Sequence, residues 1–296
     1  MSVDAVIRTE GLTKRFGATV ALDDLTLGVE RGEVLGYLGP NGAGKTTTTR
    51  LLLGLLRPTA GTASILGLDP WADTVELHAR LAYVPGELAV WPQLTGGQML
   101  DLLGALHGSV DPAYRDELCQ RFEFDPSKKG RSYSKGNRQK VGLIAALMTR
   151  AEILILDEPT AGLDPLMEMT FRGCVGEARE HGQTIFLSSH ILSEVEAVCD
   201  RVAILRQGRL ADLGTLESLR AMSAREVEVR FDGSVPDLTQ IPGVTAVRVE
   251  DGTARVQVRG SADPLIKALA THEVAQITAR EPSLEEVFLT YYGDEG

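Results

Sequence analysis

Apolar residues in the first two thirds of the chain fall into short runs, separated by longer stretches where they recur at helical spacing. Runs of this kind predict strands, and they lie at Val3–Thr9, Leu25–Val29, Glu33–Leu38, Ile153–Leu156, Thr184–Ser188 and Arg201–Leu205. Leucine spacing predicts a helix over Thr46–Leu56, which ends before Arg57-Pro58. Strands that alternate with helices indicate an α/β core with a parallel sheet.

The pattern changes twice farther along the chain. Residues 87–150 lack strand-like runs and predict a mostly helical subdomain. After about Leu219, apolar and polar residues alternate between Asp-Gly turns, which predicts strands at Val227–Phe231, Val244–Val249 and Ala254–Val258. Helices are expected at Asp263–Leu269 and at Ser283–Tyr291, where Ser283 and Glu286 match a capping box. We therefore expect a large domain over residues 1–220 and a small α+β domain over residues 221–296.

Composition and charge disfavour several classes of protein. The chain has 296 residues and a net charge of −11, which disfavours a protein whose main partner is nucleic acid. Cys119, Cys174 and Cys199 show no metal or disulfide spacing, as in a reducing cytosol. No apolar run approaches the roughly 18 residues of a membrane span, and the start of the chain lacks a secretory signal pattern. If this chain works at a membrane, a partner must hold it there.

The loop after the third predicted strand has the spacing of a phosphate-binding loop, glycine, four residues, then Gly-Lys-Thr. It reads Gly39-Pro40-Asn41-Gly42-Ala43-Gly44-Lys45-Thr46, and Thr47 follows it. Glycines let successive backbone N–H groups point at one phosphate, and the next helix adds its positive dipole end. Lys45 is expected to reach the β- and γ-phosphates, and the Thr46 hydroxyl to coordinate Mg²⁺. The alternative is a glycine turn beside a lysine.

Two acids close the apolar run Ile153–Leu156. Asp157 is the expected metal ligand, and Glu158 the expected catalytic base that polarises water for attack on the γ-phosphate. The alternative is that both are structural, because many parallel strands end in acids. The phosphate loop upstream favours the catalytic interpretation.

From these residues onward, the order of motifs over residues 3–220 resembles the ATP-binding-cassette (ABC) family. A segment similar to the family signature Leu-Ser-Gly-Gly-Gln precedes the acids and reads Tyr133-Ser134-Lys135-Gly136-Asn137-Arg138-Gln139. Ala161-Gly162-Leu163-Asp164 is similar to the D-loop, and His190 matches the switch histidine. Phe16 lies where the family stacks an aromatic ring on adenine. Taken singly, these residues read as a surface turn, a helix cap and a core aromatic.

The resemblance implies a P-loop NTPase of the ABC type that binds ATP and Mg²⁺. It also implies a head-to-tail pair with a second copy of the chain. In that pair Ser134, Gly136 and Asp164 contact the nucleotide held by the partner's loop. Lys45, Glu158 and His190 are the expected catalytic residues.

The chain departs from the family pattern at two places. Tyr133, Lys135 and Asn137 replace the usual signature residues, as in similar Ser-Lys-Gly versions among ATPases of ABC-2-type exporters. Gly86 stands where the family usually has a glutamine that contacts Mg²⁺, and the neighbouring Glu87 is either a substitute or a surface acid.

The C-terminal segment narrows the subgroup. Residues 281–288, Glu-Pro-Ser-Leu-Glu-Glu-Val-Phe, resemble the tail of daunorubicin-resistance-type exporter ATPases. This implies a motor subunit at the cytoplasmic face of the membrane, attached to an ABC-2-type permease. In the ABC family the permease docks after the Gly86 loop, which corresponds to Val90–His107 here, although core packing explains the apolar face of this segment equally well. The alternatives are an importer ATPase and a soluble ABC ATPase acting on ribosomes or DNA.

Overall fold

The computed structural model describes residues 5–108, 110–222, 225–280 and 283–292. The chain forms two compact units, Met1–Leu213 and Gly214–Gly296. The domain division predicted after residue 220 lies a few residues beyond this one and stays a prediction. Within the described residues, no helix combines the length and apolar character needed to cross a membrane.

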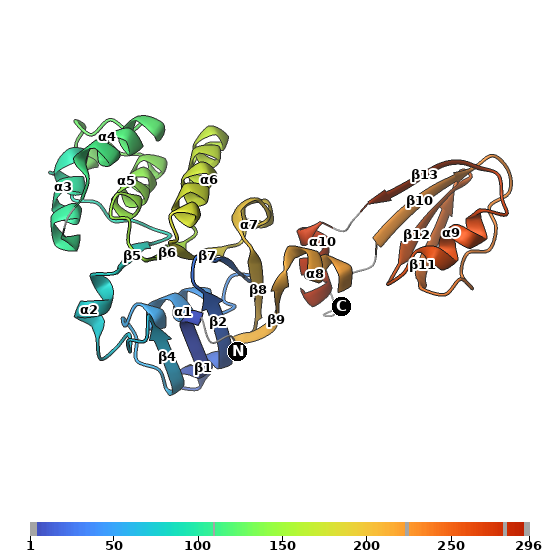
Figure 1. Cartoon of the computed structure of the whole chain (residues 1–296), viewed down its shortest axis with the longest axis horizontal. Coiled ribbons are helices and arrows are strands. Elements are labelled where there is room, and N and C mark those ends of the chain that lie inside the picture. Colours follow the sequence, from blue (N-terminus) through green and yellow to red (C-terminus); the bar gives the residue numbers. More distant parts are fainter. Residues whose placement is uncertain (1–4, 109, 223–224, 281–282, 293–296) are drawn as a thin grey trace. The chain divides into compact units, whose positions relative to one another are not determined.

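The first unit is built around a six-stranded sheet (Figure 1). Its strand order is β5-β6-β7-β3-β8-β9, and the pairs from β5 to β8 are parallel. The strands are β3 (Val34–Leu38), β5 (Leu81–Val84), β6 (Ile153–Asp157), β7 (Thr184–Ser189), β8 (Arg201–Arg206) and β9 (Arg209–Thr215). Every residue of β3, β6 and β7 is buried, as expected for central strands covered on both faces. The predicted parallel α/β core is therefore confirmed.

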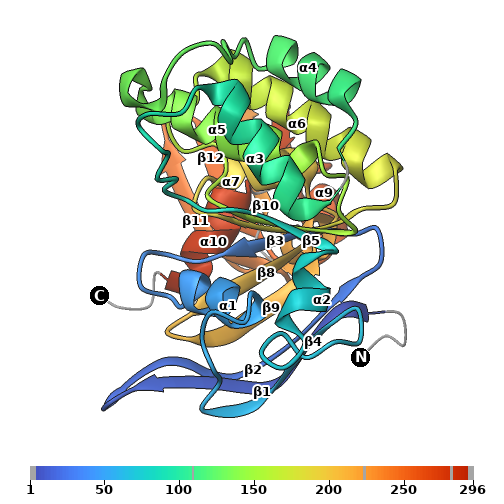
Figure 2. The same cartoon turned by 90° about the vertical axis from the view of Figure 1, so that its left-hand side faces the viewer.

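A separate antiparallel sheet forms the edge of the first unit. Its order is β2-β1-β4, made of β1 (Ala5–Phe16), β2 (Thr19–Glu30) and β4 (Ala60–Ile65). The strands predicted at Val3–Thr9 and Leu25–Val29 belong here, although Val3 and Asp4 lie outside the described residues. Figures 1 and 2 show this sheet on the side of the unit opposite the helices that follow β5.

Seven α-helices lie among the described residues of the first unit. They are α1 (Lys45–Leu52), α2 (Thr74–His78), α3 (Gly96–His107), α4 (Pro112–Arg121), α5 (Lys135–Leu147), α6 (Pro165–Glu180) and α7 (Leu192–Val198). The mostly helical character predicted for residues 87–150 is confirmed by α3, α4 and α5, which pack together in Figure 2. The helix predicted over Thr46–Leu56 ends earlier. Gly54 follows it with a φ of +66°, and a Cβ there would lie 2.0 Å from the Pro70 carbonyl oxygen.

The second unit is a small α+β domain, as predicted. Its antiparallel sheet has the order β11-β12-β10-β13, from β10 (Arg225–Phe231), β11 (Val244–Glu250), β12 (Thr253–Val258) and β13 (Val274–Arg280). Its helices are α8 (Leu216–Met222), α9 (Asp263–Leu269) and α10 (Leu284–Tyr292). Leu265 and Leu269 of α9 join the apolar core of the sheet.

The start of α10 confirms the predicted capping box. The Glu286 backbone N–H donates to Ser283 Oγ at 3.2 Å, and the Ser283 N–H donates to Glu286 Oε2 at 2.9 Å. Glu281 and Pro282 of the tail motif lie outside the described residues.

Candidate functional site

The phosphate loop connects β3 to α1 through backbone conformations that glycine permits. Gly44 precedes α1 with a φ of +111°, and a Cβ there would lie 2.7 Å from the Ala21 carbonyl oxygen. At Gly39 a Cβ would lie 2.8 Å from the Leu205 carbonyl oxygen. The loop therefore needs glycine at both positions. No side chain caps the N-terminus of α1, so its first N–H groups and positive dipole end can face an anion.

Lys45 is the first residue of α1 and folds back over the loop. Its side chain is only 7% exposed, and Nζ donates to the Gly39 carbonyl oxygen at 2.6 Å. Nζ also lies 3.8 Å from Glu158 Oε1. A buried ammonium group held against the loop is positioned to bind the outer phosphates of a nucleotide.

The two acids predicted as metal ligand and base close β6. Asp157 is 6% exposed and accepts a hydrogen bond from Ser188 Oγ of the neighbouring strand β7. Glu158 has a φ of +50°, a left-handed conformation that is uncommon for a glutamate. Its N–H donates to the Ser188 carbonyl oxygen at 2.9 Å. Ser188 therefore links the backbone of one acid and the side chain of the other to β7.

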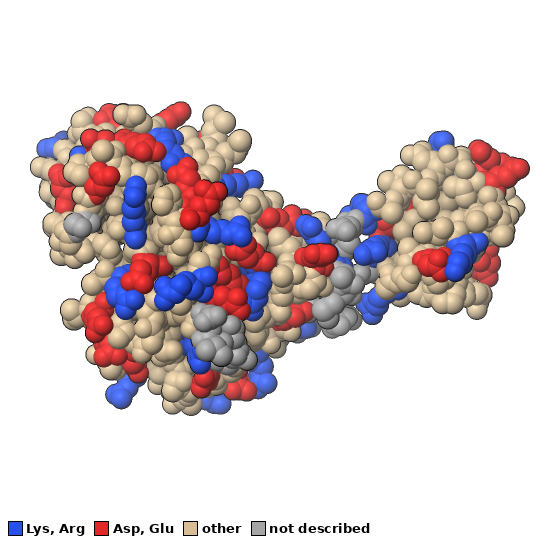
Figure 3. Space-filling view, in the orientation of Figure 1, with Lys and Arg blue, Asp and Glu red and all other residues tan. Residues whose placement is uncertain are grey.

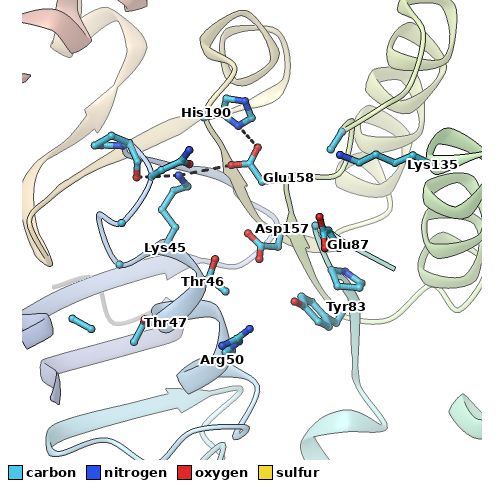
Figure 4. A pocket seen from close by; sticks show the side chains of 18 residues that line it. Lys45, Thr46, Thr47, Arg50, Tyr83, Glu87, Lys135, Asp157, Glu158 and His190 are labelled. Carbon is cyan, nitrogen blue, oxygen red and sulfur yellow. Dashed lines mark hydrogen bonds and ion pairs between the residues drawn. The ribbon is translucent and has the colours of Figure 1, made fainter. Parts of the chain in front are cut away.

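His190 follows β7 and contacts Glu158 directly. Its Nδ1 lies 2.5 Å from Glu158 Oε2, while Lys45 approaches the other oxygen of the same carboxylate. Figure 4 shows the three side chains meeting over the phosphate loop. Glu158 is thus held between two groups that fix its orientation, as a general base requires.

These residues line one cavity of about 720 Å³. Its lining includes ten residues predicted from the sequence: Pro40, Asn41, Gly42, Gly44, Lys45, Thr46, Thr47, Asp157, Glu158 and His190. Gly39 and Ala43 of the same loop are buried. The structure therefore brings the phosphate loop, the acidic pair and His190 together from β3, β6 and β7.

Phe16 is not among the residues that line this cavity. The residue lies at the end of β1 and is 49% exposed, and the Lys14 amino group lies 5.1 Å from its ring centroid. Its predicted stacking on adenine stays a prediction.

The residues expected to act across a pair of chains also lie away from the cavity lining. Ser134 is exposed and caps α5 by accepting from the Asn137 N–H at 3.2 Å. Asp164 is exposed and caps α6. Both therefore perform the plain structural role of a helix cap, and their roles toward a partner's nucleotide stay predictions, as does that of Gly136.

Besides Glu87, three polar side chains of the lining were absent from the predicted site residues: Arg50, Tyr83 and Lys135. Arg50 follows Thr46 by one helical turn on α1, a spacing that puts both on one face and could have revealed it. Burial, and then the charge of Asp157, raises the pKa of Tyr83 to about 12, so it presents a neutral hydroxyl. For Lys135 the only sequence signal was its departure from the family signature.

Gly86 lies in the same lining, beside Glu87. A Cβ at Gly86 would lie 3.3 Å from the Asp157 carbonyl oxygen and 3.5 Å from Glu158 Cβ. The loop therefore passes close to the acidic pair at this position.

The oxygen donors fit a magnesium ion accompanied by a nucleotide. Mg²⁺ in such sites takes one or two protein oxygens and completes its shell with phosphate oxygens and water. Asp157 supplies a buried carboxylate, and the exposed Thr46 supplies a hydroxyl on the same cavity. Among the described residues, no group of three or more His, Cys, Asp or Glu forms an independent metal site.

Two family descriptions match separate parts of the chain. Residues 22–161 match the ABC transporter family, and residues 214–292 match the C-terminal domain of ATP-binding proteins like DrrA1-3. The first match includes the phosphate loop and the acidic pair. The second begins where the second compact unit begins.

Known relatives align with almost the whole chain. The daunorubicin resistance ATP-binding protein DrrA3 of Streptomyces coeruleorubidus is 36% identical over 99% of this chain and 97% of that protein. The bacitracin transport ATP-binding protein BcrA of Enterococcus faecalis is 31% identical over 100% of this chain and 99% of that protein. A solved ATP-binding subunit of an ABC transporter is 32% identical, has a TM-score of 0.68, and covers 73% of this chain and 92% of its own.

Proposed function

Because the chain belongs to the ABC transporter family of ATP-binding proteins, we propose that it is the motor subunit of an exporter. It hydrolyses Mg-ATP and powers efflux of an antibiotic or another small molecule through a separate permease. The DrrA-like second unit and the drug-resistance relatives support export over import.

The observation that carries the ATPase activity is the Glu158 carboxylate, held between Lys45 and His190 at the phosphate loop. Lys45 and the N-terminus of α1 bind the phosphates and orient the γ-phosphate. Glu158 accepts a proton from the attacking water, and His190 keeps the carboxylate turned toward it. A bound Mg²⁺, held by Thr46 and Asp157, would offset the negative charge of the phosphates.

The exposed signature residue Ser134 supports pairing with a second copy of the chain, head to tail. A phosphate loop surrounds only one side of a nucleotide, and the N-terminus of α5 in a partner can close the other side. ATP then favours the closed pair, and hydrolysis releases it.

An ABC-2-type permease holds the pair at the cytoplasmic face of the membrane. Nucleic acid is not a partner in this proposal. The net charge of −11 supports this, as do the interspersed acidic and basic side chains on the face of the first unit drawn in Figure 3.

Replacement of Glu158 tests the proposal. Glu158→Gln should lower steady ATP turnover by about 100-fold to 10,000-fold, the usual contribution of a general base, while ATP binding and pairing persist. Glu180→Gln, at the exposed end of α6, is the matched control and should leave turnover unchanged. Unchanged turnover in Glu158→Gln would refute the role of this residue.

Affinity capture from membranes tests the transport assignment. Recovery of a six-helix permease without a solute-binding protein supports export. Recovery with a solute-binding protein would indicate an importer, and recovery of ribosomes or DNA would indicate a soluble ABC ATPase.

A further inference from the structure

We propose that Lys135 binds the phosphates of the nucleotide held by its own chain, although it stands inside the signature segment. This inference rests on the proposed ATP site. Lys135 lines the same cavity as Lys45, Glu158 and His190. Figure 4 shows its side chain extending from the start of α5 toward Glu158, across the cavity from the phosphate loop.

The surrounding backbone directs this side chain. A Cβ at Gly162 would lie 3.3 Å from both Cγ and Cδ of Lys135, so the aliphatic stem lies against the loop that follows Glu158. The next residue, Gly136, is as close: a Cβ there would lie 2.6 Å from the Gly162 carbonyl oxygen. The stem therefore packs against this loop while the ammonium group lines the cavity.

The charge of Lys135 is available to a ligand. Lys45 already lies 3.8 Å from a Glu158 oxygen. In contrast, Lys135 makes no ion pair within 4.0 Å in the part of the chain that the structure describes. A triphosphate entering the cavity would meet Lys45 on one wall and Lys135 on the other. A second ammonium group of this kind binds the phosphates as a point charge.

Neighbouring residues of the signature segment thus serve different nucleotides. Ser134 lies outside the lining and faces solvent, where a partner's nucleotide can approach. Lys135 lies inside the lining of its own cavity. The start of α5 would contact one nucleotide in each chain of a pair, which links the two sites through adjacent residues.

Replacement of the charge alone tests the contact. Lys135→Met keeps the stem and should weaken ATP binding by roughly tenfold to a hundredfold, the loss expected for one hydrogen bond to a charged group. AMP binding should change little, and Lys135→Arg should restore most of the ATP affinity. Lys129→Met, an exposed lysine before the same helix, is the control. Equal ATP affinity in Lys135→Met and the unaltered chain would overturn the proposal.

Mixed pairs decide which nucleotide Lys135 serves. Lys135→Met chains are mixed with Glu158→Gln chains, and ATP turnover is compared with the mean of the two variants alone. If Lys135 acts on its own chain's nucleotide, each mixed site lacks one group and turnover stays at the mean. Turnover above the mean would show that Lys135 acts on the partner's nucleotide, and would overturn the proposal.

The two proposals fail differently. If the unaltered chain does not bind ATP, the proposed function fails. If the unaltered chain binds ATP and only the role of Lys135 is absent, the proposed function stands.

Discussion

A buried hydrogen bond between Tyr37 and Thr48 connects the strand before the phosphate loop to the helix after it. The two hydroxyl oxygens lie 3.0 Å apart, and both side chains are 0% exposed. Thr48 Oγ1 also donates to the Gly44 carbonyl oxygen at 3.1 Å. Tyr37 therefore donates to Thr48, and the chain of hydrogen bonds ends on the loop itself. Burial raises the pKa of Tyr37, which keeps the donor protonated.

Tyr37→Phe removes this donor and preserves the ring, whose centroid lies 4.9 Å from that of Phe186. The loss should be about 1 kcal/mol of unfolding free energy, the usual net value of a neutral hydrogen bond. In a unit of this size that corresponds to a fall in Tm of about 2–4 °C. Thr48→Val breaks both hydrogen bonds and should cost more.

A double-mutant cycle isolates the pair. Both tryptophans of the chain, Trp71 and Trp91, lie in the first unit, so their fluorescence reports its unfolding in urea. The coupling free energy between Tyr37→Phe and Thr48→Val should be about 0.5–1.5 kcal/mol. The slope of the unfolding free energy against urea concentration should be the same in all four proteins of the cycle. Strictly additive losses would refute the assignment of a shared hydrogen bond.

Two further predictions concern residues of the helices α5, α6 and α7. Gly136→Ala places a Cβ 2.6 Å from the Gly162 carbonyl oxygen and should cost about 1–3 kcal/mol in urea unfolding. Gly176→Ala on α6 meets nothing within 4 Å and should stabilise by about 0.5–1 kcal/mol; equal effects would contradict the clash. Burial raises the pKa of Glu194, which accepts from Ser189 at 2.6 Å, so its ionisation above the usual 4.5 costs stability as pH rises. Glu194→Gln should therefore gain stability relative to the unaltered chain as the pH rises above 4.5, and a pH-independent difference would disprove this.

The order of apolar and polar residues predicted those strands whose burial depends on their own sequence alone. Buried parallel strands such as β6 need apolar side chains on both faces, so an unbroken aliphatic run identified them. The edge strand β13 escaped prediction because all its residues except Val274 are exposed, which leaves no alternation. The sheet that contains β1 and β2 was also not separated from the parallel sheet, because strand partners depend on residues far apart in sequence.

Some residues of the candidate site were likewise predicted from the sequence, and other features of the site were found only in the structure. Phosphate binding imposes a fixed spacing on Gly39 to Thr46, so sequence identified it. The left-handed conformation of Glu158 has no sequence signal, because glutamate rarely adopts it. The place of Lys135 on the cavity wall depends on its packing against Gly162, a contact between the start of α5 and the loop after β6 that only the folded chain brings together.

The position of β3 in the sheet affects how the chain is made. β3 directly precedes the phosphate loop, yet its two neighbours, β7 and β8, come much later in the sequence. A chain that leaves the ribosome N-terminus first therefore carries the whole loop long before the strands that enclose it. Gly39 even packs against the carbonyl oxygen of Leu205, in β8. The surroundings of the phosphate loop seen in the structure can therefore form only after β8 has been synthesised.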